Sequence, residues 1–164
     1  MDVALSNDNI VSALGPPSED IVLYRDLHRY NSIGELFYED NLRIILIESK
    51  PGYGHWVSLI KNGDTYLYFN SYGHPPDYEM RFLKPFYRNL LGEDPAEIHR
   101  LAKGKKLIWN KMKLQGKKSS TCGRWQVLWA EMYNRGYSLK EFQTFLKENK
   151  TNTYDDLVLA LVPI

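Results

Sequence analysis

Three β-rich runs occupy the middle of the chain, at residues 43–49, 55–61 and 65–70. Short segments rich in glycine, proline, asparagine and aspartate separate them, and the second of these segments reads Asn–Gly–Asp. Runs of this length between turn residues predict strands, and such short connections predict antiparallel hairpins. We therefore expect an antiparallel meander, with residues 106–114 as a further candidate strand.

Helical spacing dominates the second half of the chain. Residues 122–135 carry apolar side chains at intervals of three and four, and Gly136 follows them as a stop signal. Residues 78–91 show a similar spacing with Pro85 inside it. Because proline cannot donate a helical hydrogen bond, this helix is expected to start there, kink or split.

Capping signals mark the shorter helices. A serine or threonine followed three residues later by an acidic residue is typical of a helix start. This pattern occurs at Ser32 with Glu35, at Ser138 with Glu141, and at Thr153 with Asp156. It predicts a short helix over residues 33–38 and two C-terminal helices, the last of which ends at Pro163. A further short helix is expected over residues 6–14.

These elements predict an α+β fold, with a central, mainly antiparallel sheet flanked by helices. The length of 164 residues predicts a single domain, 1–164. No apolar run approaches the roughly 18 residues of a membrane span, and the first residues lack the features of a secretory signal. The single cysteine fits a reducing, intracellular compartment and excludes an internal disulfide or a thiolate-rich zinc site. The net charge of +1 gives no global attraction to nucleic acid or membrane.

The lone cysteine, Cys122, falls at the predicted start of the strongest helix. Unpaired N–H groups and partial positive charge at a helix N-terminus lower the pKa of a thiol and favour the thiolate. Gly123 leaves room for a substrate backbone to approach, and the Cys122 N–H can point at a developing oxyanion. Cys122 is therefore a candidate nucleophile, and the alternative is a small buried residue without reactivity.

A thiol nucleophile needs a base, usually a histidine, and that base needs an orienting partner. His55 opens a predicted strand, and Asn70 ends the neighbouring strand of the same hairpin. The two side chains are thus expected at one end of the sheet, where asparagine can accept from the imidazole and fix its tautomer. His74, in a Gly–His–Pro–Pro loop, is the rival base, and His28 and His99 show no partner pattern.

The segments GHWVSLI, YLYFNSYG and LQGKKSSTCGRW resemble the adenovirus maturation protease (adenain-like) family, in the clan that includes the SUMO-deconjugating proteases. The resemblance covers roughly residues 40–135 and implies a fold with the catalytic cysteine at a helix N-terminus. It implies that Cys122 is the nucleophile and that His55 is the general base and later the general acid. Gln115, separated from Cys122 by six residues as in the family, is implied as a side chain of the oxyanion hole.

The same resemblance implies an endopeptidase that cleaves viral capsid or core precursors during virion maturation. Trp56 matches the aromatic residue after the family's histidine, and Gly54, Trp56 and Gly123 would border an extended substrate. Asn70 stands where the adenovirus enzymes carry a carboxylate, so it can orient His55 but has no charge with which to stabilise an imidazolium. Two other hypotheses stay open: a protease that deconjugates ubiquitin-like proteins, and a catalytically inactive binding domain of the same fold.

The resemblance also bears on cofactors and partners, because the adenovirus enzyme is activated by a disulfide-linked peptide and by DNA. With the one cysteine assigned to catalysis, no disulfide-linked activator is available. We expect no required cofactor, and any activator would be a non-covalent peptide or DNA. Seven lysines from Lys103 to Lys118 could contact phosphates, and a solvated basic face is the alternative. A monomer without membrane contact is expected, in the host cell cytoplasm or nucleus and in the virion.

Overall fold

A five-stranded mixed sheet forms the centre of the computed structural model, which describes residues 9–10, 13, 21–37, 39–51, 53–92 and 95–163. In spatial order the strands are β1 (Ile21–Leu23), β2 (Leu42–Lys50), β3 (Tyr53–Asn62), β4 (Thr65–Phe69) and β5 (Lys106–Trp109). The antiparallel meander β2–β3–β4 is confirmed. β1 and β5 join its two edges in parallel, so the sheet is antiparallel only at its centre.

Both faces of the central strands are covered, which explains the near-continuous apolar run in β2. Ile44 and Leu46 pack into one hydrophobic cluster with the C-terminal helices. Ile45 and Ile47 point to the opposite face and pack into a second cluster. Successive side chains of a strand alternate between faces, so an apolar residue at every position is what a sheet between two layers requires.

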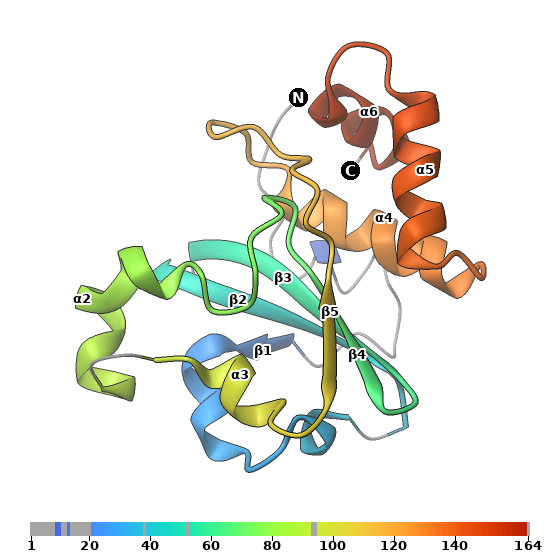
Figure 1. Cartoon of the computed structure of the whole chain (residues 1–164). Helices are drawn as coiled ribbons and strands as arrows, with labels where there is room; N and C mark the ends of the chain where they lie inside the picture. The colour runs from blue at the N-terminus through green and yellow to red at the C-terminus, as the bar shows by residue number, and fades with distance from the viewer. Residues whose placement is uncertain are drawn as a thin grey trace.

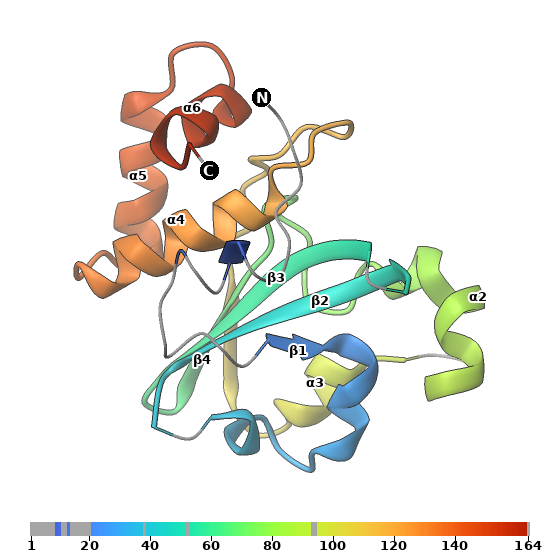
Figure 2. The same cartoon turned by 180° about the vertical axis from the view of Figure 1, so that it is seen from behind.

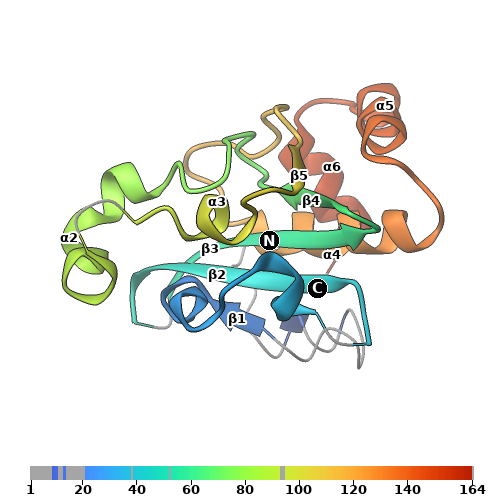
Figure 3. The ribbon, with the colours of Figure 1, turned by 60° about the horizontal axis from the view of Figure 1, so that its bottom comes forward.

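Helices supply the two outer layers. The α-helices are α2 (Met80–Leu91), α3 (Glu97–Leu101), α4 (Cys122–Asn134), α5 (Leu139–Asn149) and α6 (Tyr154–Leu161), and the 3₁₀ helices are η2 (Tyr24–Arg29) and η3 (Ile33–Leu36). Helices α4, α5 and α6 gather on one side of the sheet, with the 3₁₀ helices and α3 on the other (Figures 1 and 2). Figure 3 shows α2 and α5 beyond opposite ends of the long β2–β3 pair. The predicted α+β class is therefore confirmed.

Several local predictions hold. Helix α4 runs from Cys122 to Asn134, and Gly136 follows it with φ of 96°, a backbone conformation that favours glycine. The capping box of Ser138 with Glu141 is present at the start of α5. The Thr153 hydroxyl accepts from the Asp156 N–H at the start of α6.

Other local predictions are wrong or fall outside the described residues. Ser32 makes no cap hydrogen bond, and the segment after it is the four-residue 3₁₀ helix η3 rather than a helix over 33–38. Helix α2 neither starts nor splits at Pro85 but continues across it. Strand β5 ends at Trp109, five residues before the predicted end. Most of the predicted helix over 6–14 lies outside the described residues.

Within the described residues, no helix is both long and apolar enough to cross a membrane.

Candidate active site

Helix α4 is buried along most of its length, and this burial fixes where Cys122 lies. The Gln126 Nε2 donates to two main-chain carbonyl oxygens, 3.1 Å to that of Trp56 on β3 and 3.2 Å to that of Phe69 on β4. These are the residues next to His55 and Asn70 in the sequence. One turn of α4 separates Gln126 from Cys122. The two hydrogen bonds of Gln126 therefore hold the first turn of α4 against the strand ends that carry the candidate base and its partner.

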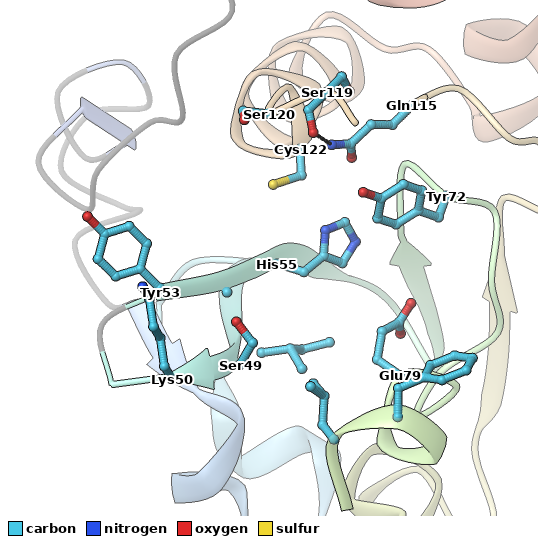
Figure 4. A pocket seen from close by; sticks show the side chains of 14 residues that line it. Ser49, Lys50, Tyr53, His55, Tyr72, Glu79, Gln115, Ser119, Ser120 and Cys122 are labelled. Atoms are coloured by element: carbon cyan, nitrogen blue, oxygen red, sulfur yellow. Dashed lines mark hydrogen bonds between the residues drawn. The ribbon is translucent and has the colours of Figure 1, made fainter. Parts of the chain in front are cut away.

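Cys122 opens α4 with its thiol facing His55. The residue is 8% exposed, and in Figure 4 its sulfur projects from the start of the helix into the cleft above His55. A hydrogen bond links the thiol to His55, and the main-chain N–H groups of Trp56 and Gly123 also donate to the sulfur. Thr121, the residue before the helix, makes no side-chain cap, and the Gly123 N–H of the first turn is directed at the sulfur rather than at a capping oxygen.

His55 is fixed on its other side by Asn70. The Nε2 of His55 lies 2.8 Å from the Asn70 Oδ1, and the Tyr72 ring lies against the imidazole with 4.7 Å between ring centroids. The Asn70 Oδ1 also accepts from the Tyr72 main-chain N–H at 2.9 Å. Asn110 in turn holds the Asn70 backbone, because its amide both accepts from the Asn70 N–H and donates to the Asn70 carbonyl. The predicted meeting of His55 with Asn70 is what the structure shows.

The pKa shifts of the pair favour the charged forms. Burial by itself would raise the pKa of the Cys122 thiol, but the hydrogen bond and charge of His55 outweigh it, helped by the two main-chain donors, and the pKa falls below its ordinary value. Burial likewise opposes the imidazolium, yet Cys122, Asn70 and then Glu79 raise the pKa of His55 above its ordinary value. A thiolate–imidazolium pair is therefore the arrangement that the surroundings stabilise.

Gln115 lies at the same cavity as the thiol, and two hydrogen bonds of its side-chain amide hold it in place. The Ser71 hydroxyl donates to the Gln115 Oε1 at 2.6 Å, and the Gln115 Nε2 donates to the Ser119 carbonyl at 2.9 Å (Figure 4). An amide nitrogen carries two hydrogens, so one N–H remains after the bond to Ser119. Gln115 is 2% exposed, and it lines the cavity together with Cys122.

The cavity around these groups has a volume of about 500 Å³. Its remaining walls mix polar and apolar side chains from β2, β3 and α2, and the lining residues away from Cys122 and His55 include Ile47, Ser49, Lys50, Tyr53, Phe82 and Leu83. Tyr53 and Phe82 are 64% and 68% exposed at its rim. An open cleft of this size beside the thiol can admit a peptide-sized ligand.

The three predicted substrate contacts divide into two groups. Gly54 lines the cavity, and a Cβ atom there would lie 2.0 Å from the Ile47 carbonyl oxygen, so glycine is required by the packing of β3 on β2. Trp56 and Gly123 do not line the cavity. The Trp56 side chain is 5% exposed in the core, and both residues reach the site through main-chain N–H groups directed at the sulfur.

Three positions at the site carried no signal in the sequence. Tyr72 packs on the His55 ring, Glu79 accepts from the Asn70 amide at 3.1 Å, and Asn110 holds the Asn70 backbone. Each contact joins segments whose spacing follows no helix or strand period. The rival base His74 bonds Glu79 at 3.0 Å and is not among the residues that line the cavity.

Asp155 of α6 anchors the loop between Gln115 and Cys122. Its carboxylate accepts from the Gly116 N–H at 2.9 Å, from the Ser119 hydroxyl at 3.2 Å and from the Thr121 hydroxyl at 2.6 Å. The three donors bracket the loop on either side. The position of the candidate oxyanion donor thus depends on a helix more than thirty residues further along the chain.

Replacing Asp155 by alanine should lower the free energy of unfolding by about 2–3 kcal/mol, because three donors lose a charged acceptor. Urea denaturation of the purified variants measures this loss. Asp156→Ala is the matched control, since its side chain is exposed and accepts from the exposed Asn152 amide, and it should cost under about 0.5 kcal/mol. Equal losses for the two variants would contradict the anchoring role.

Among the described residues, no group of three or more histidine, cysteine, aspartate or glutamate side chains could hold a metal ion. The seven lysines from Lys103 to Lys118 are all exposed, and Lys105 lies 3.7 Å from an Asp64 carboxylate oxygen.

Comparison with known proteins gives a related viral sequence and a weak structural likeness. The uncharacterized protein V9 of Sputnik virophage is 36% identical over 131 residues, which is 77% of this chain and 74% of the relative. The solved structure of the Chlamydia abortus effector protein ChlaDUB is similar with a TM-score of 0.33 and 13% identity, covering 96% of this chain and 88% of the effector chain. A likeness at that score supports no conclusion. No protein-family model matches the sequence.

Proposed function

This chain belongs to the family of the virophage protein V9, and we propose that it is a cysteine endopeptidase. In this proposal Cys122 is the nucleophile, His55 the general base and acid, and Asn70 the residue that orients His55. Gln115 supplies an oxyanion donor. The observation that carries the proposal is the hydrogen-bonded series from the sole thiol through His55 to Asn70, at the head of a helix and beside an open cleft.

Acylation follows from the positions of these groups. His55 takes the thiol proton, and the Cys122 thiolate attacks the scissile carbonyl carbon to form a C–S bond. The carbonyl π electrons move to oxygen, and the resulting oxyanion accepts from the remaining Gln115 N–H and from the Cys122 main-chain N–H. The tetrahedral intermediate then collapses, the C–N bond breaks, and the His55 imidazolium protonates the leaving amine.

Deacylation uses the same groups in reverse. His55, now neutral, removes a proton from a water molecule, and the oxygen attacks the thioester carbon. The second tetrahedral oxyanion is stabilised by the same two donors. When the C–S bond breaks, the carboxylic acid leaves and the thiolate–imidazolium pair is restored. Asn70 keeps Nε2 protonated throughout, so Nδ1 is the nitrogen that exchanges the proton.

The two pKa shifts set the direction of the pH dependence. Because the pKa of Cys122 is lowered, thiolate persists as pH falls below the range of an ordinary thiol, and it is lost only when pH passes through the lowered value. Because the pKa of His55 is raised, the imidazolium persists to higher pH and is lost when pH rises through that value. Activity should therefore peak between the two apparent pKa values of the coupled pair.

Alkylation of the thiol at acidic pH tests the proposal without a substrate. An ordinary thiol with a pKa near 8.5 is only about 0.3% ionised at pH 6, so iodoacetamide should modify Cys122 at least about tenfold faster than free cysteine at that pH. Mass spectrometry of the intact protein measures the rate of alkylation without ambiguity, because the chain has one cysteine. His55→Ala should return the pH profile to that of an ordinary thiol. A wild-type profile already like free cysteine would exclude the thiolate mechanism.

The viral relative supports the finer proposal that the substrates are viral capsid or core precursors, processed during virion maturation. The enzyme would then act in the host cell cytoplasm or nucleus and in the virion. It would need no metal or organic cofactor, and an activating peptide would bind without a disulfide because Cys122 is the nucleophile. The exposed lysines from Lys103 to Lys118 are the surface through which DNA would bind as an activator.

A further inference from the structure

The hydrogen-bonded series at the cleft does not end at Asn70. The Asn70 Nδ2 donates to the Glu79 Oε2 at 3.1 Å, and the same carboxylate oxygen lies 3.0 Å from the His74 Nδ1. Glu79 itself lines the cavity, and its carboxylate points up toward the His55 side of the cleft in Figure 4. A carboxylate is therefore present at the site, and the Asn70 side chain connects it to His55.

The partners of Asn70 fix the orientation of its amide. The Tyr72 main-chain N–H is only a donor, so the oxygen of the amide must face it. The Glu79 carboxylate is only an acceptor when ionised, so the nitrogen of the amide must face it. With Oδ1 in that place, the His55 Nε2 must carry a hydrogen, and Nδ1 is left to take the thiol proton.

One oxygen of the Glu79 carboxylate makes two contacts and the other makes none among the described residues. The Glu79 side chain is 13% exposed, and the Oε1 atom is buried without a hydrogen-bond partner among the described residues. A buried acceptor left unpaired costs free energy, and native proteins tolerate few of them. Retaining such a group is more easily explained by catalysis than by folding.

The segment that carries Glu79 is held firmly by Asp77. The Asp77 backbone has φ of 66°, unusual outside glycine, and its carboxylate accepts from the Tyr24 hydroxyl at 2.6 Å. The same carboxylate accepts from the Ile98 and His99 N–H groups at 3.1 and 3.0 Å. Glu79, two residues further on, is thus placed by contacts that reach η2 and α3 rather than by a mobile loop.

We propose that Glu79 is a positioning residue of the active site, whose carboxylate orients and polarises the Asn70 amide and so acts on His55 through an asparagine. The inference rests on the proposed peptidase function. Polarisation increases the negative charge on the Asn70 oxygen, which accepts from His55 and stabilises the imidazolium. Glu79 thereby supplies, at one remove, the charge that Asn70 lacks.

The electrostatics of the cleft agree with this role. Burial disfavours the His55 imidazolium, and Cys122, Asn70 and then Glu79 raise the pKa of His55 against it. Other titratable groups also face the His55–Asn70–Glu79 series. They are Tyr68 on β4, Tyr72 and His74 after β4, and Asp77 before α2. The Asp155 carboxylate of α6 acts on Tyr72 by its charge.

Glu79→Gln tests the charge while it keeps the shape. We expect kcat/KM to fall about tenfold or more, as losses of outer partners at catalytic sites do. The alkaline limb of the pH profile should move to lower pH, because the imidazolium loses a nearby negative charge. The midpoint of urea denaturation should stay unchanged or rise, because the substitution removes a buried carboxylate. Glu148→Gln, which removes an exposed carboxylate on α5, should leave all three measurements unchanged.

Moving the carboxylate from residue 79 to residue 70 should restore the activity that Glu79→Gln loses. Asn70→Asp in the wild-type background sets two carboxylates side by side and should lower activity. In the Glu79→Gln background the carboxylate introduced by Asn70→Asp can accept from His55 and from the new glutamine amide, so the double variant should recover at least about tenfold over Glu79→Gln alone. A purely structural role predicts no such reversal.

Three outcomes separate the inference from the function on which it rests. A wild-type thiol with an ordinary alkylation profile refutes the peptidase itself. A wild-type enzyme that is active, with Glu79→Gln identical to it in rate and pH profile, overturns only the role of Glu79. A Glu79→Gln variant that loses stability in parallel with activity, without recovery in the double variant, shows that Glu79 is structural.

Discussion

We expect Cys122→Ala to abolish measurable peptide-bond cleavage, lowering kcat by about 10⁵-fold or more, the scale seen when a catalytic nucleophile is removed. The chain has no second thiol that could replace Cys122, whose pKa is lowered by its hydrogen bond to His55. Incubating recombinant candidate capsid and core precursors with each enzyme, followed by mass spectrometry of the products, measures the loss and locates the cleavage sites.

Two companion variants make the result specific. Cys122→Ser keeps the size of the side chain but replaces the thiol with a hydroxyl of much higher pKa, so it should be nearly as inactive as alanine while it remains folded. Met132→Leu, a volume-conserving change further along α4, should retain activity. Cleavage that persists in Cys122→Ala would show that another protein or another site is responsible and would end the peptidase proposal.

The core of the candidate site follows from local patterns. Cys122 opens the most strongly periodic helix, and a helix boundary is a signal that the sequence carries on its own. His55 and Asn70 belong to one hairpin, so turn chemistry alone brings their strand ends together. The register that aligns Ser58 with Phe69 does bring these residues to one end of the sheet. Local pairing rules are therefore enough for this part of the geometry.

The supports of the site depend on contacts that no local pattern predicts. Strand β1 has only three residues, and its pairing with β2 depends on the tertiary fold. Gln126 lies on a helix whose polar positions are expected at the surface, yet it is fully buried and bonds two strands. Asp155 and Glu79 bond residues on other elements, chosen by packing. Side chains of this kind position the candidate catalytic groups, and their partners become visible only in three dimensions.

Gln115→Ala should lower kcat by about 10²–10³-fold, the usual cost of removing one oxyanion donor, while KM changes little. KM should be spared because, in the proposed mechanism, the Gln115 N–H interacts with charge that develops only in the tetrahedral intermediate. Gln115→Glu should be at least as damaging, since a carboxylate cannot donate and would repel the oxyanion. Initial rates over a range of concentrations of a peptide spanning a mapped cleavage site separate kcat from KM.

Ser71→Ala gives an intermediate effect that tests how the amide is held. The Ser71 hydroxyl fixes the Gln115 oxygen, so loss of this hydroxyl should let the amide rotate. The rotation should lower kcat by about tenfold, although Ser71 does not contact the substrate. In the Gln115→Ala background the same change should add almost nothing, because the donor it orients is gone. Independent, additive losses would mean that Ser71 acts on something other than Gln115. A Gln115→Ala enzyme with full kcat would remove this side chain from the oxyanion hole and leave the main-chain N–H of Cys122 as the donor.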